Sequence, residues 1–215
     1  MSGIAPLCYA ARGSTAGDVV QSGLPDIFLH VRVLVGVVLG LGITRVLSGL
    51  AKFIQHPGHK RLYLTHLLWL AIVLLSAIHF WWFELGLGRV QPWPFELFVF
   101  VLLYAFLFFL IATLLIPDDI EEYTGWEDYY FSRRRWFFGM LAATVPVDLI
   151  DTLVKGPAYF QSLGIEYPIR LVVVLVLCAI AAWTRNKCFH LAFAIAYLLY
   201  LISWILRLYR VLDFS

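Results

Sequence analysis

The chain has 215 residues, of which 62% are hydrophobic and 14% are charged, and its mean hydropathy is +0.85. Soluble domains have roughly a quarter charged residues and about half apolar ones, so a soluble core of this size could not bury so much apolar surface. The composition therefore excludes a water-soluble globular protein and predicts an all-α integral membrane protein in contact with the lipid bilayer. The formal net charge of +2 gives no reason to expect a nucleic-acid partner.

The first 25 residues lack the basic start and the apolar segment that a secretory signal peptide needs. We interpret residues 1–25 as an N-terminal tail and residues 26–215 as a single membrane domain. No segment outside the apolar runs is long enough to fold as a soluble domain.

Six apolar runs follow the tail, each bounded by proline, glycine or charged residues. A hydrocarbon core about 30 Å thick needs about 20 apolar residues in a helix, and unpaired backbone groups are too costly in lipid for irregular spans. The sequence therefore predicts a compact bundle of six transmembrane helices. The predicted spans are residues 27–50, 62–85, 94–116, 136–154, 168–184 and 188–208.

An even number of spans predicts that the N-terminus and the C-terminus lie on the same side of the membrane. Basic residues divide almost evenly between the two sides, which leaves the orientation weakly specified. The run Arg133, Arg134 and Arg135 beside the fourth span favours the inside for that end, and therefore the outside for both termini.

Small residues recur every four positions along the first span, at Gly36, Gly40, Thr44 and Ser48. This spacing places them on one helix face, and small-residue faces let helices approach closely in lipid. We expect a contact with another helix of the same chain. A dimer interface is the alternative, so the partners considered are a second copy of the chain or the other subunits of a membrane complex.

Charged residues within the spans are the main functional signal. Arg45 lies about eight residues from the Phe53 end of the first span, or about 12 Å, and Asp148 lies about twelve residues from Trp136, or about 18 Å. An unpaired charge at such depths costs from a few to more than ten kcal/mol, so partners are expected. We predict an Arg45–Asp148 pair, with Asp151 on the same helix face as Asp148. A purely architectural bridge is the alternative to a functional site.

Two further features favour transport. Pro146 lies in the fourth span, where proline favours a kink one turn before the aspartates. Alignment of residues 43–52 with 146–155 pairs Arg45 with Asp148, which indicates a weak 3+3 inverted repeat of the kind that many transporters contain. The first functional hypothesis is therefore translocation of an ion, a proton or a small solute through the bundle.

The first alternative is a structural or assembly subunit of a larger membrane complex. The second is an electron carrier with b-type haem, because His66 and His190 lie at similar depth from one side while His30 and His79 lie toward the other. Ionisable groups closer to the span ends, such as Glu84 and Arg207, are expected to reach solvent.

Familiar enzyme motifs are absent from the sequence. It has no G-x-S-x-G, no H-E-x-x-H and no phosphate-binding glycine loop, and its three cysteines have neither metal-binding nor redox spacing. We therefore expect a non-enzymatic role with no metal site and, outside the haem alternative, no cofactor.

Overall fold

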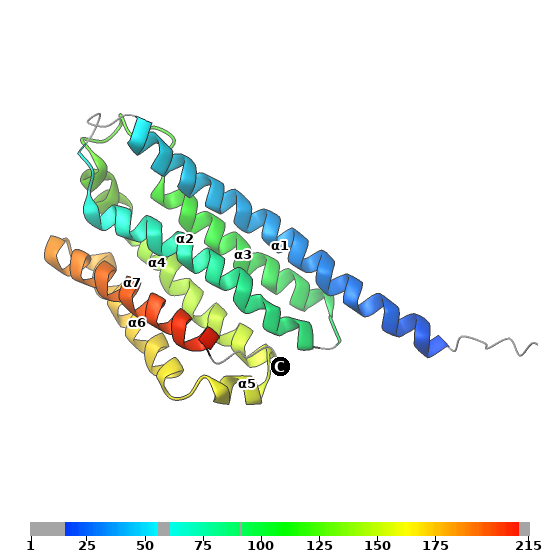
Figure 1. The fold of residues 1–215 in the computed structure, drawn as a ribbon. Coiled ribbons are helices and arrows are strands. Elements are labelled where there is room, and N and C mark those ends of the chain that lie inside the picture. The colour runs from blue at the N-terminus through cyan, green and yellow to red at the C-terminus, as the bar shows by residue number, and fades with distance from the viewer. Residues whose placement is uncertain (1–15, 56–60, 91, 211–215) are drawn as a thin grey trace, which may run out of the picture.

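A computed structural model describes residues 16–55, 61–90 and 92–210, and over these ranges the chain is helical with connecting loops (Figure 1). Six of the described helices are long and apolar enough to cross a membrane, which confirms the predicted all-α, multi-pass architecture. The elements in chain order are α1 (Ala16–Gln55), α2 (Leu64–Phe83), the short 3₁₀ helix η1 (Glu84–Arg89), α3 (Phe95–Leu115), α4 (Trp126–Val154), α5 (Pro157–Ser162), α6 (Glu166–Trp183) and α7 (Lys187–Arg210).

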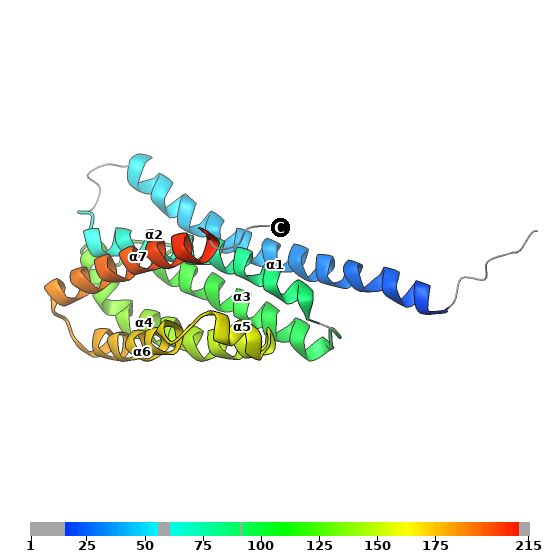
Figure 2. The same ribbon diagram turned by 60° about the horizontal axis from the view of Figure 1, so that its bottom comes forward.

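Successive long helices run in alternating directions and pack along their lengths. The most extensive contacts join α1 to α3, α4 to α6 and α2 to α7, whereas α6 and α7 touch little although they are consecutive. In Figure 2, α1, α2 and α7 lie above α4, α5 and α6, with α3 between them. We call the end of the bundle that holds η1 and α5 the α5 end, and the end that holds the α3–α4 loop the Trp126 end.

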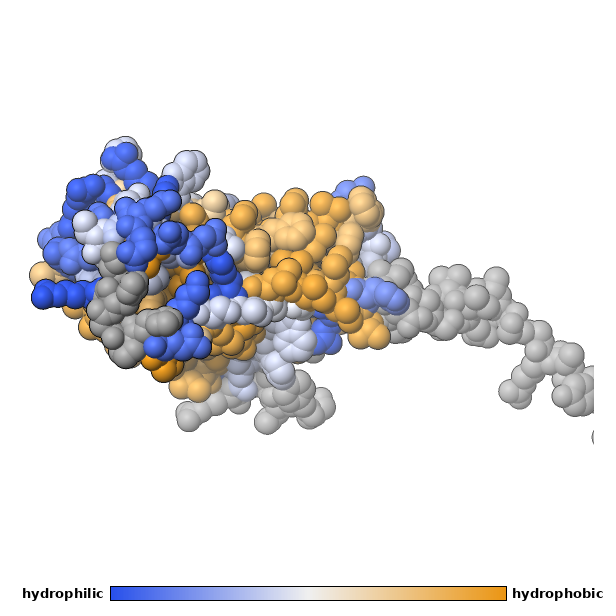
Figure 3. All heavy atoms as spheres, turned by 90° about the horizontal axis from the view of Figure 1, so that it is seen from above, coloured by the Kyte–Doolittle hydropathy of each residue, from blue (hydrophilic) through white to orange (hydrophobic). Residues whose placement is uncertain are grey.

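The outer surface of the bundle is apolar between its two ends. Large side chains such as Leu41, Leu103, Val172 and Leu199 are more than half exposed, at 58%, 59%, 62% and 62%. Figure 3 shows a broad hydrophobic surface beside a hydrophilic Trp126 end. This is the surface expected of helices that face lipid.

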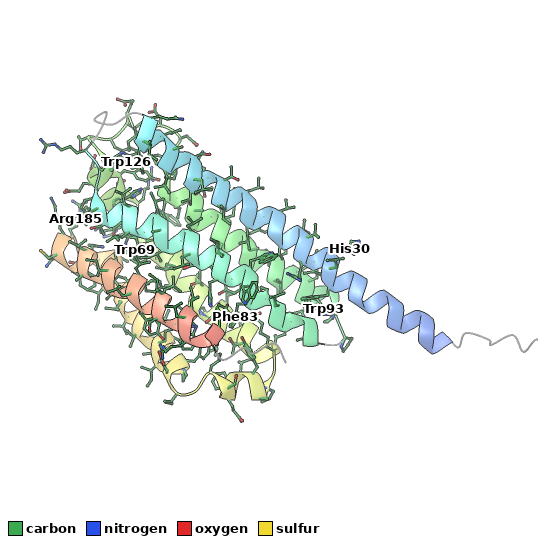
Figure 4. The ribbon with its side chains drawn as sticks, in the orientation of Figure 1. His30, Trp69, Phe83, Trp93, Trp126 and Arg185 are labelled. Carbon is green, nitrogen blue, oxygen red and sulfur yellow. The ribbon has the colours of Figure 1, made fainter. Side chains whose placement is uncertain are left out.

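The half of the bundle nearer the Trp126 end has a tightly packed aromatic core. Trp69 on α2 is fully buried, and its ring lies 5.1 Å from that of Phe137 and 5.3 Å from those of Phe138 and Phe193, all edge-on. Such T-shaped pairs add to the stabilisation from buried area. We call these four residues the aromatic core; Figure 4 shows Trp69 on α2, between the level of Trp126 and that of Phe83.

Two boundaries differ from the sequence prediction. Helix α4 begins at Trp126 rather than at residue 136, and Glu127 and Asp128 in its first turn are favourable at a helix N-terminus. The basic run 133–135 therefore lies within the helix and not before it. Residues 16–25, predicted as part of the tail, belong to α1, while the rest of the predicted tail lies outside the described residues.

Of the predicted small-residue face of α1, Gly36 lies against α2, where an added Cβ would be 3.4 Å from Trp81 Nε1, but the rest of the face makes no close contact with a described helix. Thr44 and Ser48 are exposed, and a side chain at Gly40 would meet no described atom within 4 Å. The close approaches to α3 occur instead at Gly42, where an added Cβ would lie 3.4 Å from the backbone of Phe109, and at Gly49, where it would overlap the side chain of Ile116 at the end of α3. The contact face of α1 is rotated away from the predicted one because its large apolar residues, such as Val46, take the buried positions.

Candidate intramembrane ionic site

Arg45 and Asp148 do not form the predicted pair. Arg45 forms an ion pair with Asp118, and it donates a hydrogen bond of 3.0 Å from Nη2 to the carbonyl oxygen of Ile116 at the end of α3. The Asp118 side chain is 92% exposed and that of Arg45 is 31% exposed. Arg45 thus reaches out of the apolar region toward the Trp126 end, as long basic side chains commonly do.

The Arg45–Asp148 pair was predicted wrongly because the start of α4 was misplaced. The predicted depth of Asp148 assumes a span that begins at Trp136, but the helix begins ten positions earlier in the chain, at Trp126, and ends at Val154. Asp148 is therefore about six residues from the α5 end, or about 9 Å. Arg45 and Asp148 lie toward opposite ends of the bundle.

Asp148 pairs instead with Arg170 on α6. The Arg170 Nη2 atom lies 2.9 Å from Asp148 Oδ2, and the two side chains are 19% and 20% exposed. The Tyr167 hydroxyl donates to the same carboxylate oxygen at 3.0 Å and hydrogen-bonds Thr152 at 2.8 Å. The carboxylate is therefore held by one charged and one neutral donor, both from α6.

Asp151, one turn further along α4, belongs to a second and more deeply buried group. Lys155 forms ion pairs with Asp151 and with Glu84, and its Nζ lies 3.1 Å from Glu84 Oε1. The side chains of Glu84, Lys155 and Asp151 are 5%, 1% and 0% exposed. Glu84 was expected to reach solvent, but η1 turns it inward. We call these three residues the acidic triad.

The acidic triad contains two carboxyl groups and one ammonium group. If both carboxyls were ionised, one negative charge would lack a counter-ion in a buried setting, which is costly. Glu84 Oε2 and Asp151 Oδ1 are buried and have no hydrogen-bond partner in the part of the chain that the structure describes. The composition of the group thus provides a place for one bound proton.

Aromatic rings flank the acidic triad on the side of the α5 end. The Lys155 ammonium lies 3.8 Å from the centre of the Phe83 ring and 6.0 Å from that of Tyr159 on α5. Such cation–π contacts partly compensate a charge that has lost water. Burial raises the pKa of the Tyr159 phenol, and the negative charge of Asp151 adds to the effect, so this side chain is neutral at physiological pH.

A cavity of about 100 Å³ lies beside the Asp148–Arg170 pair. Its walls come from α2, α3, α4, α6 and α7, and most are aromatic or aliphatic. The residues with polar groups on its wall are His79, Ser76, Thr144, Tyr104, Tyr167, Tyr197, Tyr200, Trp204, Asp148 and Arg170. The cavity extends from the centre of the bundle toward the α5 end, and the aromatic core separates it from the Trp126 end.

The four histidines do not form two facing pairs. Tyr130 lies between His66 and His190, with ring centres 6.3 Å and 5.4 Å away. Both ring nitrogens of His190 are hydrogen-bonded, to the Tyr130 hydroxyl and to the Thr184 carbonyl oxygen. His79 lines the cavity, whereas His30 lies on the exposed face of α1 (Figure 4). This arrangement does not fit axial ligation of haem at these positions.

Comparison with known proteins finds no matching family model, no matching characterised protein and no matching solved structure. The interpretation of the site therefore depends on its own geometry.

Sequence reasoning found Asp148 and Asp151 but missed Glu84, Arg170 and Tyr167, which complete the two groups. Lys155 lies four residues after Asp151 on one helix, a spacing that places the two side chains on the same face. The missing residues come from α6 and from the turn after α2, and their distance in sequence from α4 left no local signal. One feature of the sequence could have identified Glu84 and Arg170 as partners. Both are charged residues near the ends of predicted spans, on the same side of the membrane as Asp148 and Asp151.

Proposed function

We propose that the protein is a carrier that moves a small solute across the membrane together with a proton. The observation that carries this proposal is the acidic triad, in which two carboxyls share one ammonium group at 5% exposure or less. A buried carboxyl in excess of its counter-charges binds and releases a proton as its surroundings change. Intramembrane carboxyls of this kind mark proton and ion pathways in transporters.

The adjoining cavity supports a carrier rather than an open pore. It reaches the surface near Asp148 and Arg170, which are about one-fifth exposed. On its other side, the fully buried rings of Trp69 and Phe138 pack edge-on between the cavity and the Trp126 end. A carrier would expose the cavity to the second side by repacking this aromatic core, as in alternating access.

We place both ends of the membrane domain outside. The Trp126 end has a cluster of basic residues, Arg133, Arg134 and Arg135, together with Arg61, Arg185 and Lys187. Basic residues near span ends are enriched on the cytoplasmic side, so the cluster favours that side for the Trp126 end. The weak 3+3 inverted repeat remains a prediction that fits a carrier.

A transport assay that screens solutes in pools tests the proposal. Liposomes containing the protein and an internal pH indicator would receive, under an inward proton gradient, separate pools of amino acids, carboxylates, amines and sugars. We expect one pool to accelerate internal acidification relative to protein-free liposomes, and we expect Asp151→Asn and Glu84→Gln to abolish this response. Glu96→Gln, at an exposed position on α3, is the matched control. If no pool elicits a protein-dependent response, the proposal is wrong.

The second hypothesis is that the chain assembles with copies of itself or with other subunits. The part of the small-residue face at Gly40, Thr44 and Ser48 favours this hypothesis, because a second helix could pack closely against these small residues. The mass of the protein extracted in mild detergent would test it. A single-chain mass would contradict assembly.

A further inference from the structure

The cavity and its ion pair indicate which kind of solute the carrier takes. We propose that the solute is a small monocarboxylate, bound by Arg170, and that Asp148 takes up the proton that accompanies it. This inference depends on the proposed carrier function and adds a substrate class and a role for each of the two residues.

Arg170 is the anchor for the carboxylate. Its guanidinium stands between two rings, with its central carbon 5.0 Å from the centre of Tyr167 and 4.9 Å from that of Trp204. Among the described residues, Asp148 is its one hydrogen-bond acceptor, reached through Nη2. The fork of the guanidinium therefore retains donors for a second carboxylate at the edge of the cavity, and bidentate pairing of this kind is the strongest that arginine makes.

The charge balance of the pair selects an anion over a cation. A carboxylate that binds the remaining donors of Arg170 adds a negative charge beside Asp148, and the charge is balanced when the aspartate accepts a proton. A cation that binds Asp148 would leave Arg170 charged and alone, because arginine does not release its proton in proteins. Of these two, the anion that arrives with a proton leaves the cavity without an uncompensated charge.

The proton balance is simple. One carboxylate ion and one proton enter, the Asp148 carboxylate becomes a carboxylic acid, and the net charge of the cavity does not change. The charged groups around Asp148 are Arg170 from α6, Asp151 and Lys155 from α4, and Glu84 from η1. Neutral titratable groups surround it from α2, α3, α5, α6 and α7: His79, Tyr104, Tyr159, Tyr167, Tyr197 and Tyr200. Asp151 lies one turn away on the same helix, so Asp148 is close to the acidic triad.

The rest of the cavity fits a short apolar substituent. Phe80, Phe108 and Leu141 form walls without charge, and Ser76 adds a hydroxyl. A cavity of about 150 Å³ holds benzene, which has six non-hydrogen atoms, so the 100 Å³ present here suits an acid of about four or five non-hydrogen atoms. Propionate has this size.

Binding to the purified full-length protein in detergent tests the inference, and micelles avoid the passive permeation of propionic acid through lipid. Calorimetry would measure binding of propionate, its neutral analogue propionamide and the cation propylammonium. A pH indicator in weak buffer would report proton uptake. We expect propionate alone to bind, with about one proton taken up per anion.

Variants separate the two roles. Asp148→Asn should bind propionate without proton uptake, and Arg170→Gln should weaken binding by about 10- to 100-fold, the loss of a charged hydrogen bond. The double variant Asp148→Asn, Arg170→Gln removes both charges, so it should fold and still fail to bind. Arg207→Gln, which changes a half-exposed arginine of the same end, is the control and should bind normally.

Binding of propylammonium, equal binding of propionamide, or absence of propionate binding would overturn the inference. A transport response to another solute pool, without propionate binding, would leave the carrier function intact and reject the carboxylate alone. Propionate binding without a response to any pool would reject the carrier function instead.

Discussion

Lys155 determines the stability of the acidic triad, because its ammonium contacts both Glu84 and Asp151 at 1% exposure. Removal of one partner from a buried ionic group leaves uncompensated charge, whereas removal of matched charges costs much less. The same residue would therefore support both folding and proton binding.

We expect Lys155→Met to lower the free energy of unfolding by about 3–5 kcal/mol, because two buried carboxyls lose their counter-ion. Reversible unfolding in mixed detergent micelles would measure this loss. The double variant Lys155→Met, Glu84→Gln should recover part of the lost free energy of unfolding. Lys52→Met, at an exposed lysine near the end of α1, should change little, and an equal loss at both lysines would contradict the burial of the triad.

Arg45 provides a second test at the residue scale. Because Asp118 is 92% exposed, Asp118→Asn should cost at most about 1 kcal/mol of unfolding free energy. Arg45→Gln and Asp148→Asn should have additive effects within about 0.5 kcal/mol, since the structure gives them different partners. A coupling energy above this limit in the double-mutant cycle would show that Arg45 and Asp148 interact directly.

At the scale of helices, the α1–α3 contact depends on a glycine that the four-residue spacing did not identify. Gly42 faces the backbone of Phe109, while Gly40 faces open space. We expect Gly42→Val to destabilise the protein by about 1–3 kcal/mol through overpacking. Gly40→Val carries the same change in helix propensity and is the matched control. Similar losses of thermal stability for the two variants would contradict the contact.

The sequence was sufficient to locate the six long helices, because each apolar run is long enough to span lipid and ends at a strong breaker. It placed the start of α4 wrongly because Arg133, Arg134 and Arg135 look like a loop, although Arg134 is only 8% exposed within the helix. Helix boundaries in polar segments depend on tertiary contacts that a local pattern does not contain.

Only part of the ionic site could be predicted from the sequence, again because helix boundaries and packing depend on tertiary contacts. Depth along a helix can be counted from the sequence, but it depends on where the helix starts, and rotation about the axis depends on its neighbours. Asp148 and Asp151 were identified as buried charges, while Arg170 and Glu84 needed the packing of α6 and η1 on α4 to be recognised as their partners.

For the whole molecule, the alternation of the six spans predicts that α4 connects opposite sides of the membrane. Single cysteines would be introduced at exposed Gln161 in α5 and exposed Glu122 before α4, in a variant without the three native cysteines. An impermeant maleimide should label position 161 in intact cells and position 122 only after permeabilisation. Labelling of both from one side would contradict the crossing of α4, and the reverse pattern would contradict the orientation alone.

The central claim is that the acidic triad holds one exchangeable proton inside the bundle. Infrared difference spectroscopy of the purified protein, titrated with pH in H₂O and D₂O, detects the carbonyl stretch of a protonated carboxylic acid directly. We predict a band that shifts on deuteration, is lost in Glu84→Gln or Asp151→Asn, and persists in the exposed-site control Glu96→Gln. An unchanged band in both triad variants, or no such band at any pH at which the protein is folded, would contradict the claim.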